Sequence, residues 1–546
     1  MTGMAGQPFP SSAPRTATRP KPVVEAPFDF AATRSWPDWR DHVAWPVSHA
    51  ETFRLGRDMF RALLAATRQI ADDDLRHMVV LAGGVISSSG LALAETALVA
   101  QEERNAGLRF VGEPPELAFL RGEMPETERP TPRGSSAFLP QARPRWILPR
   151  RLARIKSWSP FWRLPGNLLA PTVTAISHNP LLHGYARDGV ERVGFQHAEV
   201  LFERARRRPG APATTGRAAE LALEMAQAMA RAAALDEPHG ARLRRLLLDQ
   251  IELLLARAER DLWALSHLRG LPLRVWAGTG GYWPSRALGL EVWRRGGHVT
   301  RFAHDGTQGI TDVLEPFVLG ELAVCDTFVA MTPALAEGVD LDRVGGLLPG
   351  GRRPRILGHR GVPKLARLPL DRRGKPAPRR RVVYAPTILR GFRQLMPPLL
   401  PDVIYLDWQL RVAETLAELP IDLICRPHPE GILAGLPHPL AEVAALSPHP
   451  FESLIGRADL FVFDYAQSTT FLEALCTDRP IVFIDMGTTA FTPKVRAALE
   501  RRCRVIRPRF DEAHRPWVAA EALAEAVCGG GETADPGEFR ALFMAE

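Results

Sequence analysis

Short β-branched runs, each followed by a Gly- or Ser-bearing turn and then by an amphipathic segment, recur along this 546-residue chain. The run LPLRVWAG precedes RALGLEVWRRGG, and the runs VVYAP, DLICRPH, LFVFDY and PIVFID follow at similar spacing. Strands that alternate with helices form βαβ units and parallel sheets. The pattern therefore predicts an α/β protein, in which ligands bind at the carboxyl ends of the strands.

The chain is too long for one hydrophobic core, so we expect more than one domain. A basic, Pro-rich segment indicates a linker between two Rossmann-like lobes, and the first lobe contains a long stretch of helical pattern. The expected divisions are a disordered tail (1–27), a first lobe (28–365) with a helical insertion (about 211–270), a linker (366–380), a second lobe (381–530) and a C-terminal tail with a short helix (531–546).

The longest apolar stretch, MVVLAGGVISSSGLALAETALVA from Met78, is interrupted by Gly-Gly, by Ser-Ser-Ser-Gly and by Glu95. These interruptions predict a strand, a loop and a helix rather than a membrane span. The N-terminal residues lack the apolar core of a signal peptide. The five cysteines have no Cys-x-x-Cys spacing, which indicates reduced thiols. Together these features predict a cytoplasmic protein.

The net charge of +8 favours polyanionic partners, although an Arg-rich genome explains the same excess. One segment, residues 143–163, carries seven basic residues and no acidic ones, interleaved with Trp and Phe. Such a segment suits an anionic membrane surface or a lipid-linked acceptor. Single-stranded nucleic acid, or a basic linker with buried tryptophans, are the alternatives. We predict peripheral contact with the inner membrane and no nucleic acid partner.

A polar cluster, DYAQSTT, separates the apolar runs LFVF and PIVFI. Buried hydroxyls and carboxylates cost free energy unless they are paired, so the cluster favours a ligand site. The following helix is expected to begin at Ser468 or Thr469, and helix N-termini bind phosphate. Ordinary N-capping explains the same hydroxyls. Glu473, about one turn later, is expected either near a ribose or on a solvated face.

The run DLIC ends in Arg426, Pro427, His428 and Pro429. The two prolines restrict the backbone and hold the imidazole at the carboxyl end of the strand. Arg426 and His428 are therefore predicted to clamp a phosphate. An exposed loop is the alternative.

These motifs carry a resemblance. RPHPE, followed by ADLFVFDYAQSTTFLEALCTDRPIVFID, resembles the second lobe of GT-B-fold transferases of bacterial surface carbohydrates. The closest patterns are those of CDP-glycerol glycerophosphotransferases and of CMP-sugar (sialyl and Kdo) transferases. The resemblance implies two Rossmann-like lobes that face a central cleft, with His428, Ser468 and Thr469 at the donor phosphate and Glu473 at its ribose. It also implies a catalytic role for His428, which would assist departure of the leaving group. Glycerophosphotransferases usually carry Asp-Tyr-Ser-Ser where Ala466 and Gln467 intervene here, which leaves the donor open.

A transferase of this kind needs a general base near the acceptor hydroxyl. The run VTRFAHDGTQGI places His304 and Asp305 after a strand, and we favour Asp305 over His304 as the base. An Asp-Gly turn with a capping histidine explains the same residues. The Gly-rich turn WAGTGGYWPSR places Gly280 and Gly281 where GT-B enzymes approach the donor phosphates. It is neither a Walker A loop nor a dinucleotide fingerprint, and a tight βα turn also explains it.

The leading prediction is a glycosyltransferase of capsule or lipopolysaccharide biosynthesis that uses a CMP- or CDP-linked donor and a glycan or lipid-linked acceptor. No Asp-x-Asp dyad in a polar loop suggests a divalent cation, so we expect neither a metal nor a cofactor. The alternatives are a CDP-glycerol-type glycerophosphotransferase, an enzyme like UDP-sugar 2-epimerase, and a non-catalytic scaffold of a glycan assembly complex.

Overall fold

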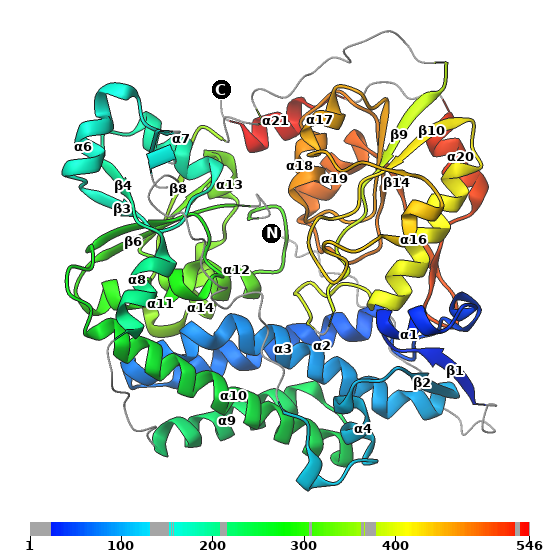
Figure 1. Cartoon of the computed structure of the whole chain (residues 1–546), viewed down its shortest axis with the longest axis horizontal. Helices are drawn as coiled ribbons and strands as arrows, with labels where there is room; N and C mark the ends of the chain where they lie inside the picture. Colours follow the sequence, from blue (N-terminus) through cyan, green and yellow to red (C-terminus); the bar gives the residue numbers. More distant parts are fainter. Residues whose placement is uncertain are drawn as a thin grey trace, which may run out of the picture.

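The computed structural model of the chain describes residues 23–131, 152–153, 155–156, 158–207, 216–304, 308–361, 365, 378–391, 393–529 and 535–544. Within these residues, two six-stranded parallel sheets stand side by side above a layer of long helices (Figure 1).

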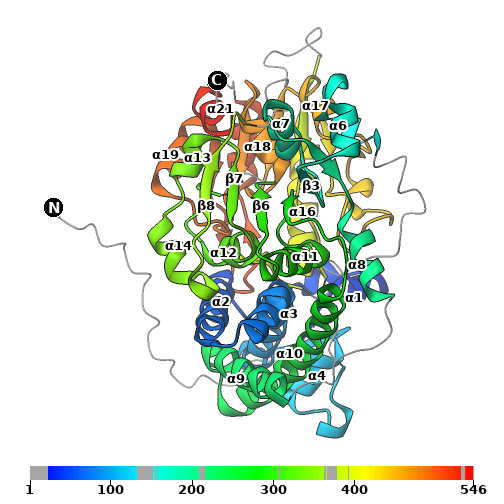
Figure 2. The same ribbon diagram turned by 90° about the vertical axis from the view of Figure 1, so that its left-hand side faces the viewer.

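The first sheet has the strand order β4-β3-β5-β6-β7-β8, and every pairing is parallel. Its order reverses between β3 and β5, the kind of position where open α/β sheets bind ligands. Figure 2 looks onto this lobe with the helical layer below it. The strands are β3 (Val173–Ala175), β4 (Val193–Phe195), β5 (Arg274–Ala277), β6 (His298–Phe302), β7 (Thr327–Ala330) and β8 (Arg355–Gly358).

The second sheet has the order β11-β10-β9-β12-β13-β14, again parallel throughout. Numbered within the lobe, this is 3-2-1-4-5-6, the order of the Rossmann fold. The predicted α/β class with two Rossmann-like lobes is therefore confirmed. The strands are β9 (Arg380–Tyr384), β10 (Ile421–Cys425), β11 (Ala445–Leu446), β12 (Leu460–Phe463), β13 (Ile481–Ile484) and β14 (Arg504–Ile506).

Helices cover both sheets. Those of the first lobe are α6 (Leu164–Leu169), α7 (Pro180–Asp188), α8 (Ala198–Arg206), α11 (Trp283–Arg294), α12 (Glu315–Gly320), α13 (Pro333–Glu337) and α14 (Leu341–Leu347). Those of the second lobe are α16 (Asp402–Ala417), α17 (Glu452–Ile455), α18 (Thr469–Leu475), α19 (Pro493–Arg502) and α20 (Ala520–Cys528), with the hairpin β15 (Arg509–Phe510) and β16 (Pro516–Trp517).

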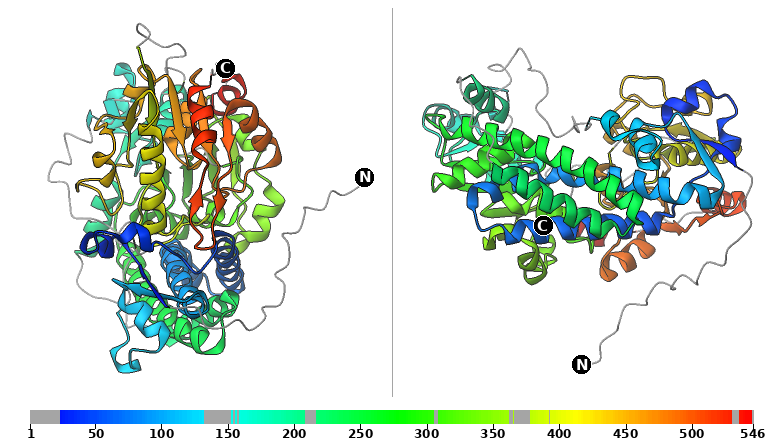
Figure 3. Two further views of the ribbon diagram at one scale, coloured as in Figure 1. Left: turned by 90° about the vertical axis from the view of Figure 1, so that its right-hand side faces the viewer. Right: turned by 90° about the horizontal axis from the view of Figure 1, so that it is seen from below.

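Four long helices form the layer beneath both lobes (Figures 1 and 3). They are α2 (His49–Gln69), α3 (Asp73–Ala106), α9 (Gly216–Ala233) and α10 (Glu237–Ser266). Helices α9 and α10 fall in the range predicted as a helical insertion, and they pack against α2 and α3. Two of the four helices in this layer, α2 and α3, therefore come from the N-terminal part of the chain, outside the predicted insertion of residues 211–270.

The predicted strand, loop and helix from Met78 onward are wrong, because α3 is one continuous helix of 34 residues. The small residues allow close packing instead of breaking the helix. A Cβ on Gly90 would lie 2.9 Å from Cε of Met229 in α9. The Ser89 hydroxyl donates to the Val85 carbonyl one turn earlier, at 2.5 Å, so it needs no loop to satisfy it.

Among the described helices, α3 alone is long and apolar enough to cross a membrane by length and composition. Of its most apolar window, 89% is buried inside the protein. Buried helices of a protein core meet the same criterion.

The predicted disordered tail is wrong for residues 24–27. They form β1 (Val24–Pro27), which pairs in parallel with β2 (Leu108–Val111). Next to this ribbon lie α1 (Phe30–Ser35) and α4 (Pro115–Arg121). Residues 1–22 and most of the predicted linker lie outside the described residues.

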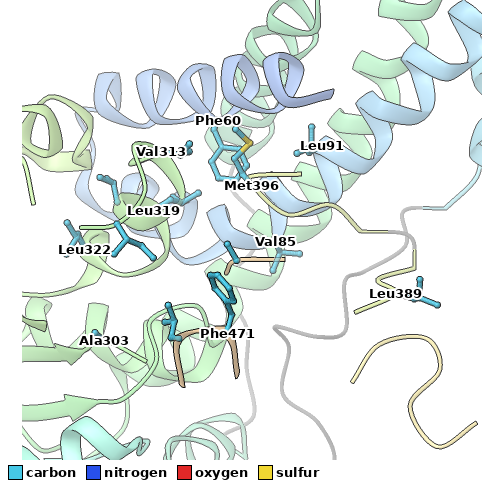
Figure 4. Packing of buried hydrophobic residues seen from close by; sticks show 14 of the residues in the cluster. Phe60, Val85, Leu91, Ala303, Val313, Leu319, Leu322, Leu389, Met396 and Phe471 are labelled. Atoms are coloured by element: carbon cyan, nitrogen blue, oxygen red, sulfur yellow. The ribbon is translucent and has the colours of Figure 1, made fainter. Parts of the chain in front are cut away.

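The connection from β9 to α16 crosses from the second lobe onto the helical layer. We call it the β9–α16 loop (residues 385–401, described except for 392). Ser88 Oγ of α3 donates to the Gln394 carbonyl at 2.7 Å, and the Gln394 amide donates back to the Ser88 carbonyl at 3.1 Å. Figure 4 shows Met396 of this loop beside Phe60 and Leu91. The loop thus fixes the second lobe on the helices.

Two further contacts join the lobes. The Asp312 amide donates to the Ala490 carbonyl at 2.8 Å, next to an isolated antiparallel bridge between Thr311 and Phe491. Helix α21 (Gly537–Phe543) contacts both lobes, because Arg540 donates to the Cys476 carbonyl at 3.0 Å and the carbonyl of Leu542 accepts from Thr332.

Candidate active site in the interlobe cleft

A cavity of about 510 Å³ lies between the lobes. Loops that follow the carboxyl ends of strands in both sheets line it, which is where such sheets bind ligands. From the first lobe come Thr279, Gly281 and Tyr282 after β5, His304, Gln308 and Gly309 after β6, Thr311, Val313, Leu314, Pro316, Phe317, Gly320 and Glu321 around α12, and Gly338 and Val339 after α13. From the second lobe come Met396 and Pro397 after β9, and Gln467 after β12.

His304 and Glu321 form an ionisable pair on the wall of this cavity. His304 Nδ1 lies 3.4 Å from Glu321 Oε1. The imidazole side chain is 44% exposed, so a substrate can reach it, whereas the Glu321 side chain is only 8% exposed. A histidine oriented by a buried carboxylate is the arrangement of a general base.

Two buried arginines, Arg286 and Arg301, lower the free-energy cost of burying the Glu321 carboxylate. Burial lowers the pKa of Arg286 to about 9 and also lowers the pKa of Arg301, while the negative charge of Glu321 opposes both shifts. Both guanidinium groups also hold neighbouring backbone. Arg301 Nη1 donates to the Thr279 carbonyl at 2.6 Å, and Arg286 Nη1 donates to the Gly320 carbonyl at 2.8 Å. These bonds fix the Gly-rich turn and the start of the Glu321 segment together.

Gly280 and Gly281 have different surroundings. A Cβ at position 280 would overlap both the Glu321 carboxylate and the Gly320 carbonyl, so a glycine is required for Glu321 to approach the turn. Gly281 lines the cavity. The packing around Gly280 supports the alternative of a tight βα turn, and the predicted contact of both glycines with donor phosphates stays a prediction.

Ser468 is the N-cap of α18, as predicted. Its Oγ accepts from the Phe471 amide at 3.1 Å and lies 3.1 Å from Thr470 Oγ1. Thr469 is the first residue of the helix. The residue that reaches the interlobe cavity is the neighbouring Gln467, whereas Ser468 and Thr469 do not line it. Their donor-binding role stays a prediction.

Arg426 and His428 follow β10, at the same edge of the second sheet. Arg426 Nε donates to the His449 carbonyl at 2.8 Å, and His428 Nδ1 accepts from the Glu430 amide at 3.2 Å. His428 is exposed, and neither residue lines the interlobe cavity. Strand β9 lies between β10 and β12, so the loops that carry His428 and Ser468 start two strands apart.

The polar cluster after β12 is only partly available to a ligand. Asp464 is 2% exposed and accepts hydrogen bonds from Tyr384 Oη at 2.7 Å, Tyr405 Oη at 2.7 Å and Trp408 Nε1 at 2.9 Å. Burial raises the pKa of Asp464, and the three hydrogen bonds oppose that shift. The predicted ligand site is therefore wrong for Asp464. Its carboxylate instead links β9 and α16 inside the core.

Glu473 is 2% exposed on α18. It does not lie on a solvated helix face, which removes that alternative, and it does not line the interlobe cavity. Its role beside a donor ribose stays a prediction.

Asp305 lies outside the described residues, so its role as the base stays a prediction. Glu321 was not predicted from the sequence. The only signal was a carboxylate inside the otherwise apolar run PFVLGELAVC, a position that suggests a buried charge. No group of three or more His, Cys, Asp or Glu side chains within the described ranges could hold a metal ion.

No protein family and no curated protein matches the chain. Among solved structures, the chain is similar to one entitled "Structure of Phytolacca americana UGT2 complexed with UDP-2fluoro-glucose and pterostilbene". The identity is 10%, the match covers 67% of this chain and 85% of the other, and the TM-score is 0.27. Because this TM-score is low, the fold assignment rests on the strand order of the two sheets.

Proposed function

We propose that this protein is a glycosyltransferase that moves a sugar from a nucleotide-activated donor to a hydroxyl group bound in the interlobe cleft. The observation that carries the proposal is the pair His304 and Glu321, 3.4 Å apart, on a cavity that both lobes line. An accessible imidazole with a buried carboxylate behind it, on a cavity large enough for a substrate, suits deprotonation of a hydroxyl.

The reaction follows from this geometry. In the tautomer with its proton on Nδ1, facing Glu321, His304 carries a basic lone pair on Nε2. Nε2 takes the proton of the acceptor hydroxyl while the hydroxyl oxygen attacks the anomeric carbon of the donor. The bond from that carbon to the donor phosphate breaks, and the nucleotide leaves with the electron pair. Glu321 stabilises the imidazolium that forms.

The second lobe is proposed to hold the donor. Two loops of this lobe lie on either side of β9. The loop after β10 carries Arg426 and His428, and the loop after β12 leads to Ser468 and Thr469 at the start of α18. The Arg426 guanidinium, the His428 imidazole and a helix N-terminus at one sheet edge favour a phosphate group. Glu473 is proposed to support the ribose side of this site from within α18.

The proposed donor is CMP- or CDP-linked, and the proposed process is capsule or lipopolysaccharide synthesis. Both follow from the resemblance of RPHPE and the DYAQSTT segment to surface-carbohydrate transferases. A CDP-glycerol donor would make the same site a glycerophosphotransferase, in which the attacked atom is phosphorus instead of carbon.

The proposed location is the cytoplasmic face of the inner membrane. In the described part of 143–163, Trp158 is buried, whereas Phe161 and Trp162 are 79% and 67% exposed. Leu169 of α6 and Val190 after α7 are 85% and 91% exposed on the same lobe. Exposed aromatic and aliphatic side chains beside basic residues suit insertion into an anionic lipid surface.

Donor hydrolysis tests the proposal. CMP-Kdo, CMP-sialic acid, CDP-glycerol and UDP-sugars are incubated with the protein, and released nucleotide is measured by mass spectrometry. We expect one donor class to be cleaved, and the cleavage to fall strongly in His304→Ala. Titration calorimetry with CMP, CDP and UDP accompanies it. Absence of both nucleotide binding and cleavage would support the non-catalytic scaffold instead.

A further inference from the structure

A second cavity, of about 290 Å³, lies where the N-terminal segment, α3 and the β9–α16 loop meet. The β9–α16 loop separates it from the cleft: Met396 lines the interlobe cavity, whereas Arg390 and Arg393 line this one. Glu95 and Thr96 of α3 line it from below. Nothing in the proposed transfer reaction uses this cavity.

Three polar atoms around this cavity are buried and have no hydrogen-bond partner within the described ranges. They are the indole nitrogen Nε1 of Trp45, the carboxylate oxygen Oε1 of Glu95 and the guanidinium nitrogen Nε of Arg390. The three residues line the cavity and are only 5%, 6% and 7% exposed. A buried polar group without a partner destabilises the folded protein, so three such groups at one cavity indicate a missing polar partner.

The remaining polar atoms of this cluster are already paired, which fixes the free ones in place. Glu95 Oε2 accepts from Gln394 Nε2 at 2.8 Å and lies 3.3 Å from Arg390 Nη2. Asp402 Oδ1 and Oδ2 accept from the amides of Arg390 and Gly391 at 2.8 and 2.6 Å. Among the residues that line the cavity, Trp45 and Arg390 therefore each keep one unpaired donor, and Glu95 keeps one unpaired acceptor.

The charges select against ionic ligands. Three carboxylates that line the cavity, on Asp29, Glu95 and Asp402, repel an anion. The guanidinium groups of Arg390 and Arg393 repel a cation. A hydroxyl group, in contrast, both donates and accepts, and so matches the two donors and the acceptor. Phe28, Phe30 and Trp45 add aromatic walls.

We propose that this cavity binds one neutral, hydroxyl-rich unit, that is, a sugar residue, at a site separate from the catalytic cleft. Its C–H faces pack on the aromatic side chains, and its hydroxyl groups bond to Trp45, Glu95 and Arg390. At about 290 Å³ the cavity is near the lower end of ligand pockets, which suits a single sugar ring. The proposal does not depend on the reaction in the cleft.

Ligand-observed saturation-transfer NMR on the full chain tests this site without any nucleotide present. The probes are glucose, galactose, mannose, rhamnose and N-acetylglucosamine, with methyl phosphate and ethanolamine as charged comparisons that also carry C–H protons. Three variants are used. Ala31→Trp fills the exposed mouth of the cavity, Trp45→Phe removes one donor and keeps the aromatic ring, and Ala31→Ser leaves the mouth open.

We expect at least one sugar to bind the unmodified chain and Ala31→Ser equally. Ala31→Trp should abolish that binding, and Trp45→Phe should weaken it about tenfold. Absence of sugar binding to the unmodified chain would overturn the proposal, as would sugar binding that Ala31→Trp leaves unchanged. Binding of methyl phosphate or ethanolamine in place of every sugar would also overturn it. Thermal unfolding of each variant identifies loss of fold, and nucleotide titration reports the cleft independently.

Discussion

His304 Nδ1 lies 3.4 Å from Glu321 Oε1, across the start of the cleft between a loop after β6 and a buried turn after α12. The two residues are separated by seventeen positions in the chain, and α12, which follows the loop after β6, brings Glu321 back beside His304.

Replacement of the carboxylate tests this pair. Glu321→Gln keeps the size of the side chain but cannot stabilise an imidazolium, so we expect kcat for donor transfer to fall about 100-fold, or roughly 3 kcal/mol. The substrate KM should change little. Steady-state kinetics measure both, and Glu521→Gln on the exposed surface of α20 is the matched control. Equal activity in the two variants would remove Glu321 from the reaction.

The Gly-rich turn is predicted to be intolerant of a side chain. In Gly280→Ala the new methyl group overlaps the Glu321 carboxylate and the Gly320 carbonyl, so we expect a loss of about 1–3 kcal/mol in the free energy of unfolding, together with reduced activity. Gly346→Ala is the control, because a Cβ there meets nothing within 4 Å. Denaturant unfolding of both variants measures the difference. An unchanged midpoint for Gly280→Ala would contradict the packing around this turn.

The Asp464 carboxylate is predicted to stabilise the second lobe. Asp464→Ala leaves Tyr384, Tyr405 and Trp408 with buried donors that lack an acceptor, so the free energy of unfolding should fall by at least about 3 kcal/mol. Tyr405→Phe removes one donor only and should cost about 1 kcal/mol. Calorimetric unfolding compares the two variants. A smaller loss in Asp464→Ala than in Tyr405→Phe would show that the carboxylate is not the centre of this network.

The exposed apolar residues of the first lobe are predicted to bind lipid. Phe161→Ser with Trp162→Ser should release the protein from vesicles rich in phosphatidylglycerol, because both side chains are largely exposed. Leu436→Ser, at a 46% exposed position of the second lobe, should not. Vesicle co-sedimentation at two salt concentrations measures the bound fraction. Binding that survives the double change would place the contact elsewhere.

Acid should destabilise the protein through His49 at the start of α2. Burial, reinforced by the charge of Arg390, lowers the pKa of His49 from 6.5 to about 4. The unfolded chain takes up this proton near pH 6.5 and the folded chain only near pH 4. The stabilising contribution is therefore present above pH 6.5 and is lost as the pH falls toward 4. It amounts to at most about 3 kcal/mol.

His49→Gln should flatten this pH dependence of the free energy of unfolding. His298→Gln is the control, since its side chain is 50% exposed. Unfolding by urea at a series of pH values between 4 and 8 measures both slopes. Identical slopes in the unmodified chain and in His49→Gln would exclude His49 as the source.

Much of the fold follows from local pattern. The β-branched runs at β5, β6, β9, β10, β12 and β13 are strands, and Ser468 caps the helix after β12, because these signals depend on residues a few positions apart. Helix α3 shows where local pattern fails. Its Ser88 and Glu95 resemble interruptions in the sequence, yet their partners are Gln394 and Arg390, some three hundred positions away.

The α/β class, the two lobes and the sheet edges that carry polar side chains can be predicted from the amino-acid sequence, since alternation of strands and helices is a local property. Which of those polar residues belong to the core and which to the site depends on contacts that form only in the folded protein. Asp464 is part of the core because two tyrosines and a tryptophan donate hydrogen bonds to its carboxylate. Glu321 is part of the candidate site because two buried arginines stabilise its negative charge beside His304. Desolvation and pairing of a charge depend on neighbours that folding supplies.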